Sequence, residues 1–315
     1  MLRVGAGSAR FARRAAGAGG VAAAGVYGYD RSSVAQTESD WKTPVAVAAV
    51  AGAAGLAYAL STPAEADRVA FWAHRWRTNS IGWHREEVHR HLRKYEAELG
   101  LVRGHGEDGA RVLVPLCGAT RDVAYLASMG HLVTGIEGVP QAVDRLFMEA
   151  SDSLAEEETA DAQTRRAYDI TTMGKYDAET EPILLDAGAG RGSALVSIGD
   201  FFTFRRERSE AGQQFDACFD RGSLVAIEPA MRERYVAEMS ALMAPGSRTL
   251  LCAVEHGPPF QAGAAQGPPF HVGGSDVEAL YGKDFEVRRL EREDETSPRF
   301  QGVGKNTVYL LTRRG

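Results

Sequence analysis

The residues with the clearest capacity for chemistry are a glycine turn and an acid that follows it. An apolar run over 111–116 leads to Gly118, and a second apolar run ends at Gly135-Ile136-Glu137. Glu137 lies nineteen residues after Gly118. An acid at that distance, at the tip of the next strand, can accept hydrogen bonds from both ribose hydroxyls of an adenosyl ligand. We therefore predict an adenosyl site at this turn; an ordinary exposed acid at a strand end is the alternative.

A second glycine-rich segment competes for the same role. Residues 184–192 have the sequence LLDAGAGRG, in which Asp186 precedes spaced glycines, as in the loops of many nucleotide-binding enzymes. Only Ser193 separates this segment from the next apolar run, so there is no room for the helix that must follow such a loop. We predict a flexible connection here, with a true nucleotide loop as the alternative.

Two arginines are candidates to hold an anionic part of a ligand. Arg221 follows the apolar run 215–219, where its planar guanidinium can grip a carboxylate or an acceptor anion; an ion pair with Asp220 is the alternative. Arg299 lies in a late loop and is the weaker candidate, for which a solvated loop arginine is the alternative.

These side chains need a framework of strands that alternate with helices. Residues 111–137 predict a strand, a glycine turn, a helix over about 122–129 and a second strand. An amphipathic helix is expected over 85–99, and an acidic, aperiodic surface insertion over 151–195. The expected fold class is α/β, doubly wound around a mostly parallel sheet. Further apolar runs that predict strands occupy 194–198, 215–219, 249–254 and 307–311.

The composition excludes several classes of protein. The chain has 315 residues, of which 44% are hydrophobic and 25% charged, as in soluble globular proteins rather than disordered or fibrous ones. A net charge of −6 provides no electrostatic footprint for nucleic acid. The three cysteines (Cys117, Cys218 and Cys252) form no CxxC pair, so we expect no disulfide framework and no metal site, in a reducing compartment.

The first 65 residues differ from the rest of the chain. Residues 1–40 carry Arg3, Arg10, Arg13 and Arg14 with no acid before Asp30, which is typical of a mitochondrial transit peptide. A secretory signal and an unaddressed tail in a cytoplasmic protein are the alternatives. Residues 41–65 are expected to form either an Ala-rich linker or a membrane anchor in some organelle. Both are kept because the uncharged run 44–60 is barely long enough for a tilted helix to span a membrane. The catalytic domain is then expected over 66–315.

The turn and its acid belong to a longer series of ordered motifs that closely resembles the thiopurine S-methyltransferase family over about residues 68–313. The resemblance implies a class I methyltransferase fold with a seven-stranded sheet, S-adenosylmethionine as cofactor and a thiol-type acceptor. The matching motifs are Phe71–Trp76, Ile81–His84, Val112–Gly118, Gly130-His131, Gly135–Glu137, Gly199–Phe202, Asp220–Ala226, Met231–Tyr235 and the second Gly-Pro-Pro-Phe, at 267–270.

The resemblance also implies roles for individual residues. Glu137 would hold the ribose of the cofactor, and Arg221 would lie between cofactor and acceptor as the catalytic residue. The sequence departs from the family pattern in three places: Ala119-Thr120 replaces the usual Lys-Ser, Trp83 replaces a Phe, and the first Gly-Pro-Pro-Phe is extra. The resemblance therefore does not determine the identity of the acceptor. The other site positions would line the cofactor (Trp76, Leu116, Gly118, Asp200 and Phe201) or the acceptor (Trp83 and Arg299), whereas Trp72 is expected to be a core residue.

The implied function is transfer of a methyl group to a thiopurine-like or small thiol by in-line displacement in a monomeric domain. Hydrosulfide, halide and metalloid anions are alternative acceptors. A non-catalytic, membrane-tethered adenosyl-binding protein is the alternative from another class. A Rossmann oxidoreductase is disfavoured, because the turn Pro115–Arg121 holds a single glycine instead of GxGxxG.

Overall fold

The computed structural model describes residues 65–102, 109–156, 171–173, 183–186, 192–207, 214–256, 268–296, 300 and 303–315. Several predictions lie outside these residues: the targeting segment 1–40, the uncharged run 44–60, Gly188 and Gly190, the first Gly-Pro-Pro-Phe, and Arg299. Among the described helices, none combines the length and the apolar character that a membrane span requires.

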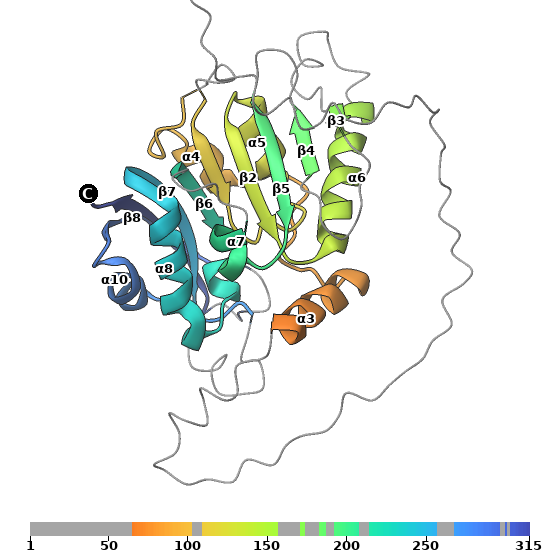
Figure 1. Cartoon of the computed structure of the whole chain (residues 1–315). Helices are drawn as coiled ribbons and strands as arrows, with labels where there is room; N and C mark the ends of the chain where they lie inside the picture. The colour runs from red at the N-terminus through yellow and green to blue at the C-terminus, as the bar shows by residue number, and fades with distance from the viewer. Residues whose placement is uncertain are drawn as a thin grey trace, which may run out of the picture. The chain divides into compact units, whose positions relative to one another are not determined.

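A nine-stranded sheet in the order β3-β4-β5-β2-β1-β6-β7-β9-β8 organises the described residues (Figure 1). The five strands from β5 to β7 in this order are parallel, whereas β9 pairs antiparallel with both β7 and β8. The predicted mostly parallel sheet is thus confirmed. The strands are β1 Arg111–Val114, β2 Leu132–Glu137, β3 Thr171–Met173, β4 Ile183–Asp186, β5 Ser193–Ile198, β6 Phe215–Arg221, β7 Met243–Glu255, β8 Phe285–Asp294 and β9 Lys305–Arg313.

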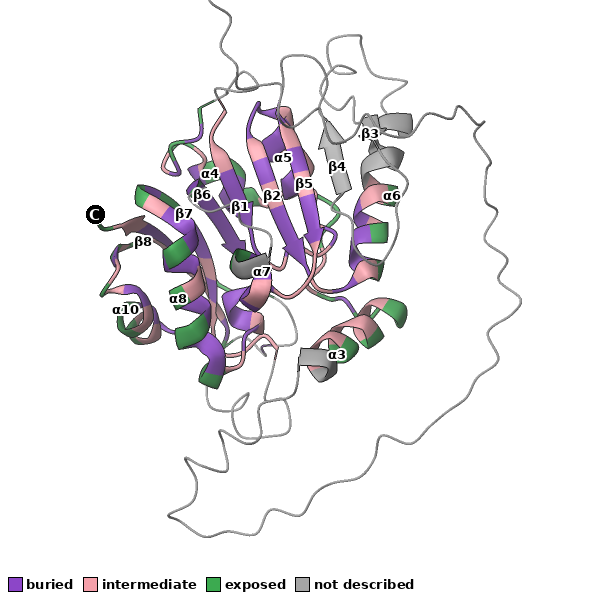
Figure 2. Cartoon of the chain, in the orientation of Figure 1, coloured by how far each residue is buried: buried purple, intermediate pink, exposed green. Residues whose placement is uncertain are grey.

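Helices cover both faces of the sheet, which is the doubly wound arrangement expected from the sequence. Val112 and Val114 belong to the apolar cluster that includes α4, α5 and α6, whereas Leu113 belongs to the cluster that includes α7, α8 and α10. Because both faces are covered, the central strands are buried and nearly continuously apolar (Figure 2). The helices are α3 Glu65–Arg77, α4 Arg90–Tyr95, α5 Asp122–Ser128, α6 Pro140–Glu156, α7 Phe201–Glu207, α8 Arg232–Leu242 and α10 Gly274–Tyr281.

The segment predicted as a surface insertion contributes to the sheet. Helix α6 extends into it, and β3 and β4 add two antiparallel strands beyond β5. The seven expected strands are therefore those from β5 to β8 in the spatial order, with β3 and β4 added at one edge. Periodicity missed these two strands because they have only three and four residues and lie in an acidic, polar stretch without a regular apolar pattern.

Two other elements differ from the sequence prediction. Strand β8 has the charged sequence FEVRRLERED and was not predicted; it pairs only with β9, so as an edge strand it tolerates charge. The helix expected over 85–99 is confined to α4. His89 caps it, because its Nδ1 accepts the backbone N–H of His91 at 3.3 Å, and residues 85–88 lie outside the helix.

Candidate active site

Hydrogen bonds hold the turn after β1 against the tip of β2. The Gly118 N–H donates to Oε2 of Glu137 at 2.8 Å, and the Cys117 N–H donates to the Ile136 carbonyl at 2.9 Å. Gly118 has a φ of +57°, and a Cβ at this position would lie 3.2 Å from the ring of Trp76. Glycine therefore permits both the left-handed backbone and the close approach of the ring.

The carboxylate of Glu137 is fixed where β2 ends. Its Oε1 accepts the Val139 N–H at 2.8 Å, and the residue is 8% exposed. Burial raises the pKa of Glu137 to about 7, although the backbone N–H groups of Val139 and Gly118 favour the ionised form. A carboxylate offers about four lone-pair positions, so two backbone donors leave room for about two hydroxyls of a ligand.

A cavity of about 830 Å³ lies where the parallel strands end, with Glu137 and Gly118 in its wall. This edge is where open α/β sheets bind their ligands, and the volume suits a cofactor together with a small acceptor. The predicted site residues that the structure describes all line this cavity: Trp76, Trp83, Leu116, Gly118, Glu137, Asp200, Phe201 and Arg221.

One wall of the cavity is aromatic. Trp83 lies edge-to-face against Trp72 and Trp76 of α3, with ring centroids 5.1 and 6.1 Å away. His84 follows Trp83, and its Nε2 lies 2.9 Å from Oε1 of Glu149 on α6, which ties this segment to the helix. Trp72, expected to be a core residue, is only half-buried and lines the cavity.

Arg221 ends β6 and lines the same cavity. Its guanidinium makes no hydrogen bond or ion pair with any residue that the structure describes. The alternative partner, Asp220, instead accepts the Tyr235 hydroxyl at 2.9 Å and the Leu224 N–H at 3.2 Å. Burial lowers the pKa of Arg221, and the nearby carboxylate of Asp122 opposes this shift. An enclosed guanidinium with no partner among the residues that the structure describes is suited to an anionic ligand group.

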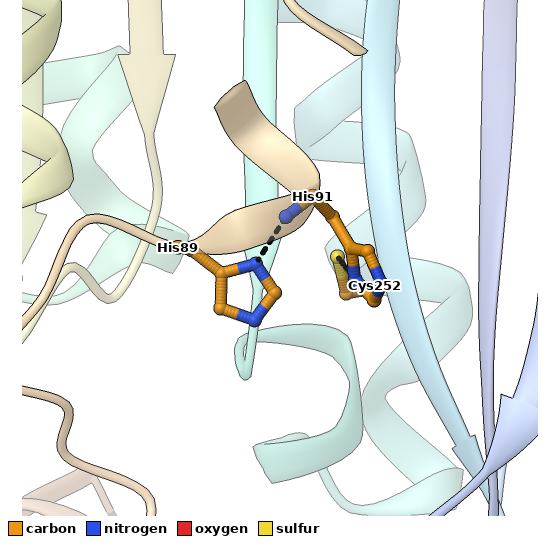
Figure 3. A group of neighbouring side chains, drawn as sticks. All are labelled: His89, His91 and Cys252. Carbon is orange, nitrogen blue, oxygen red and sulfur yellow. Dashed lines mark hydrogen bonds between the residues drawn. The ribbon is translucent and has the colours of Figure 1, made fainter. Parts of the chain in front are cut away.

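Three further side chains that the sequence analysis did not assign to the site lie close to one another in the cavity wall (Figure 3). His89 and His91 flank the start of α4, and the register of β6 and β7 pairs Cys252 with Arg221. The Nδ1 atom of His91 lies 3.9 Å from Sγ of Cys252. Burial lowers the pKa of His89 to about 3 and that of His91 to about 4, so both imidazoles are neutral at pH 7. The His-x-His spacing was the only sequence signal for this cluster.

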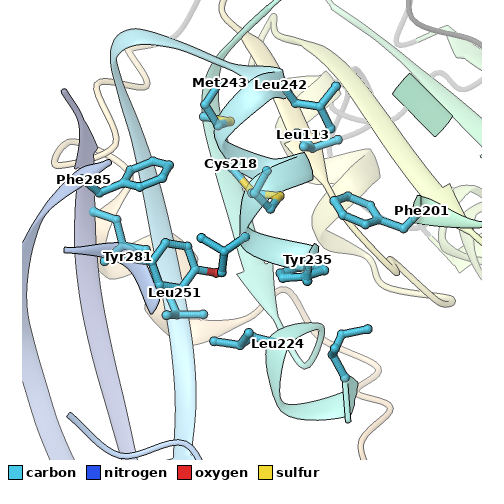
Figure 4. Close-up of a cluster of buried hydrophobic side chains, with 14 of the residues drawn as sticks. Leu113, Phe201, Cys218, Leu224, Tyr235, Leu242, Met243, Leu251, Tyr281 and Phe285 are labelled. Carbon is cyan, nitrogen blue, oxygen red and sulfur yellow. The ribbon is translucent and has the colours of Figure 1, made fainter. Parts of the chain in front are cut away.

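Asp200 and Phe201 begin α7 at the edge of the cavity. Oδ1 of Asp200 accepts the Phe202 N–H at 3.1 Å, and Oδ2 lies 3.6 Å from a guanidinium nitrogen of Arg68 on α3. Phe201 is buried in an apolar cluster, where its ring centroid lies 4.8 Å from that of Tyr235 (Figure 4). Asp200 thus presents a polar group at the cavity, whereas Phe201 shapes its wall from within the core.

Comparisons with known proteins identify the family of the chain. The family model described as thiopurine S-methyltransferase (TPMT) matches residues 67–183 and 187–314. A thiopurine S-methyltransferase of Nitrosospira multiformis is 31% identical over 256 residues, covering 78% of this chain and 97% of that protein. One of Xanthomonas campestris is 34% identical over 255 residues, covering 77% and 98%.

Among solved structures, one described as converting a disulfide bond into a thioacetal group in echinomycin biosynthesis matches with a TM-score of 0.50 and 14% identity. It covers 78% of this chain and 92% of that chain, and the likeness concerns the fold alone. The chain belongs to the thiopurine S-methyltransferase family, and the expectation of an S-adenosylmethionine-dependent S-methyltransferase for thiol-type acceptors is thereby confirmed.

Proposed function

We propose that the protein methylates the thiolate of a small acceptor that also carries a ring or a second anionic group, and that Arg221 grips this acceptor. The observation that carries the proposal is the Arg221 guanidinium, which lines the cavity without a partner among the described residues. A planar guanidinium holds flat and bidentate anions better than an ammonium does. Hydrosulfide, halides and metalloid anions can make fewer contacts with the guanidinium, so they should be poorer acceptors.

The adenosyl part of the cofactor is assigned to the turn between β1 and β2. Glu137 supports this assignment, because its carboxylate keeps about two acceptor positions for ribose hydroxyls. Gly118 supports it as well, since a side chain there would meet the ring of Trp76. As the family resemblance implies, Leu116 and Trp76 would pack on the cofactor, and Asp200 with Phe201 would border its base; all four line the cavity.

The chain's own residues would align the reactants and exclude water. When bound, S-adenosylmethionine supplies an electrophilic methyl group on a sulfonium centre. Arg221 would hold the acceptor in line and favour its ionised form, and the tryptophan wall would keep the site dry. Thiols have a pKa near about 8.5 and are partly ionised at neutral pH, so a neighbouring cation suffices and no enzyme base is required.

An acceptor screen tests this proposal. The purified full chain is incubated with methyl-labelled S-adenosylmethionine and each of four acceptor classes: carboxylate-bearing aromatic thiols, neutral aliphatic thiols, hydrosulfide and iodide. We expect the first class to give the highest kcat/KM. Faster transfer to iodide than to every thiol would contradict the proposal, and a lack of transfer to all four would favour the non-catalytic alternative.

We also propose a mitochondrial location for the protein, supported by the arginines and the absence of acids in residues 1–29. Fusion of residues 1–40 to a fluorescent protein tests the address, and fractionation of the full chain tests for attachment through 44–60. A fusion that remains cytosolic would contradict the location.

For the catalytic domain over 66–315 we propose a monomer, which sedimentation at several concentrations would check.

A further inference from the structure

We propose that His89, His91 and Cys252 form a binding site for one thiophilic metal ion, such as Zn²⁺, with a coordination position left open toward the cavity. The cysteines form no CxxC pair, and their spacing in the sequence therefore predicts no metal site. The fold instead joins a single cysteine on β7 to two histidines at the start of α4 (Figure 3).

The donor atoms lie near one another, at separations somewhat larger than those of a tetrahedral site. One donor atom from each of the three residues lies within 4.8 Å of those of the other two. A zinc ion bound at about 2.0–2.3 Å places its tetrahedral ligands roughly 3.3–3.6 Å apart. The 3.9 Å between Nδ1 of His91 and Sγ of Cys252 therefore has to shorten by only a few tenths of an ångström.

The surroundings of His91 can support the tautomer that a metal requires. Its Nε2 lies 3.4 Å from a carboxylate oxygen of Glu293 and 3.9 Å from one of Glu291, too far or too poorly aligned for a hydrogen bond, but these acids would favour a proton on Nε2 when Nδ1 binds a metal. The lone pair is then on Nδ1, which faces Cys252. His89 also has its lone pair on Nδ1, because this atom accepts the His91 N–H through a long hydrogen bond of 3.3 Å, which a metal ion would replace. A ligating imidazole whose other nitrogen meets a carboxylate is the usual arrangement in zinc proteins.

The ligand set determines the kind of ion. Two imidazole nitrogens and one sulfur select zinc or cobalt over magnesium and calcium, and three protein ligands leave a fourth position open. Cys252 pairs in register with Arg221 and both line the cavity, so an ion held by Cys252 would lie near the proposed acceptor grip. An acceptor thiolate could then complete the coordination; this last point rests on the proposed function, whereas metal binding itself does not.

Cobalt spectroscopy tests the site on the full-length protein, stripped of metal by a chelator and free of cofactor and acceptor. We expect one equivalent of Co²⁺ to give tetrahedral visible bands and a near-ultraviolet thiolate-to-cobalt band. Cys252→Ser should abolish the thiolate band. Cys218→Ala, which removes a fully buried cysteine of the core, should keep it. Glu293→Gln should weaken Zn²⁺ binding by about 10- to 100-fold in chelator competition.

A folded wild-type protein that lacks the thiolate band, or a Cys252→Ser protein that keeps it, would overturn the proposal. If the variants do not fold, zinc K-edge absorption of the wild type decides: we expect one sulfur and two imidazoles, and a shell of nitrogen and oxygen alone would overturn the site. Adding an acceptor thiol to the cobalt protein should intensify the thiolate band, and an unchanged band would remove the acceptor as fourth ligand. Binding of S-adenosylmethionine and methyl transfer are measured separately, so failure of the proposed function leaves the metal result intact.

Discussion

Replacing Glu137 by alanine tests where the cofactor binds. The carboxylate accepts two backbone N–H groups at 2.8 Å each, from Gly118 and Val139, which leaves about two lone-pair positions for ribose hydroxyls. A hydrogen bond to a charged group contributes roughly 1.5–3 kcal/mol. Because burial raises the pKa of Glu137 to about 7, only part of the population is ionised at neutral pH. We therefore expect a combined loss of about 2–3 kcal/mol, or roughly 30- to 150-fold in Kd.

Titration calorimetry with S-adenosylmethionine measures this loss, and chemical denaturation must accompany it. The substitution also leaves the N–H groups of Gly118 and Val139 without their acceptor, so we expect the free energy of unfolding to fall by about 1–3 kcal/mol. Asp186→Ala is the matched control, since this acid also precedes a glycine string but ends β4, which pairs antiparallel with β5 instead of leading into a crossover helix. Wild-type affinity in a folded Glu137→Ala protein would refute the assignment.

Three other predictions concern the same site and the chain that carries it. The folded-state pKa of Glu137, about 7, exceeds its ordinary value of 4.5, so the folded protein keeps a proton between these pH values that the unfolded chain loses. The free energy of unfolding should therefore fall as pH rises through this window, while the affinity for S-adenosylmethionine should rise as the carboxylate ionises. Denaturant melts measure the first trend and calorimetry the second, and Glu137→Gln should flatten both. An unchanged slope in this variant would contradict the prediction. Gly118→Ala places a side chain at φ +57° against Trp76, so it should lower stability by about 1–2 kcal/mol and weaken cofactor binding. Gly246→Ala is the control: its φ is +79° but open space surrounds it, so it should lower stability without changing cofactor binding. A chain of residues 66–315 should fold and bind cofactor like the full chain in the same assays; misfolding of this fragment alone would move the domain boundary.

Local patterns in the sequence predicted the end of the cavity to which we assign the cofactor. The strand, turn, helix and strand from Arg111 to Glu137 are contiguous, so apolar periodicity and a glycine with positive φ place Glu137 beside Gly118 without long-range information. The prediction for the glycine string after Asp186 rested on its position, and the strands on either side of it, β4 and β5, pair antiparallel, unlike the parallel strands that flank a nucleotide-binding loop. The remaining motifs, by their order along the chain, indicated the thiopurine S-methyltransferase family, and the family in turn implied the fold and the cofactor.

The end of the cavity to which we assign the acceptor depends on contacts that no local pattern contains. His91 and Cys252 are 161 residues apart in the sequence. They come close because α4 and the side chain of Cys252 on β7 pack in the same apolar cluster on one face of the sheet. The absence of an Arg221–Asp220 ion pair follows from Tyr235 and Leu224, which occupy the Asp220 carboxylate from the other side of β6. Strand β8, which carries Glu291 and Glu293, escaped prediction because an edge strand tolerates alternating charge.

The most direct test of the central claim is the pH profile of kcat/KM for two aromatic thiols of different pKa, in the wild type and in Arg221→Lys. If Arg221 grips an acceptor that ionises by itself, the apparent pKa follows that of each free thiol. Arg221→Lys keeps the charge but loses the fork, so it should lower kcat/KM by about 10- to 100-fold, or ~1.4–2.7 kcal/mol, while cofactor affinity is retained. For hydrosulfide the loss should be small. One apparent pKa shared by both thiols would indicate an enzyme base, and an unchanged rate in Arg221→Lys would place the acceptor elsewhere.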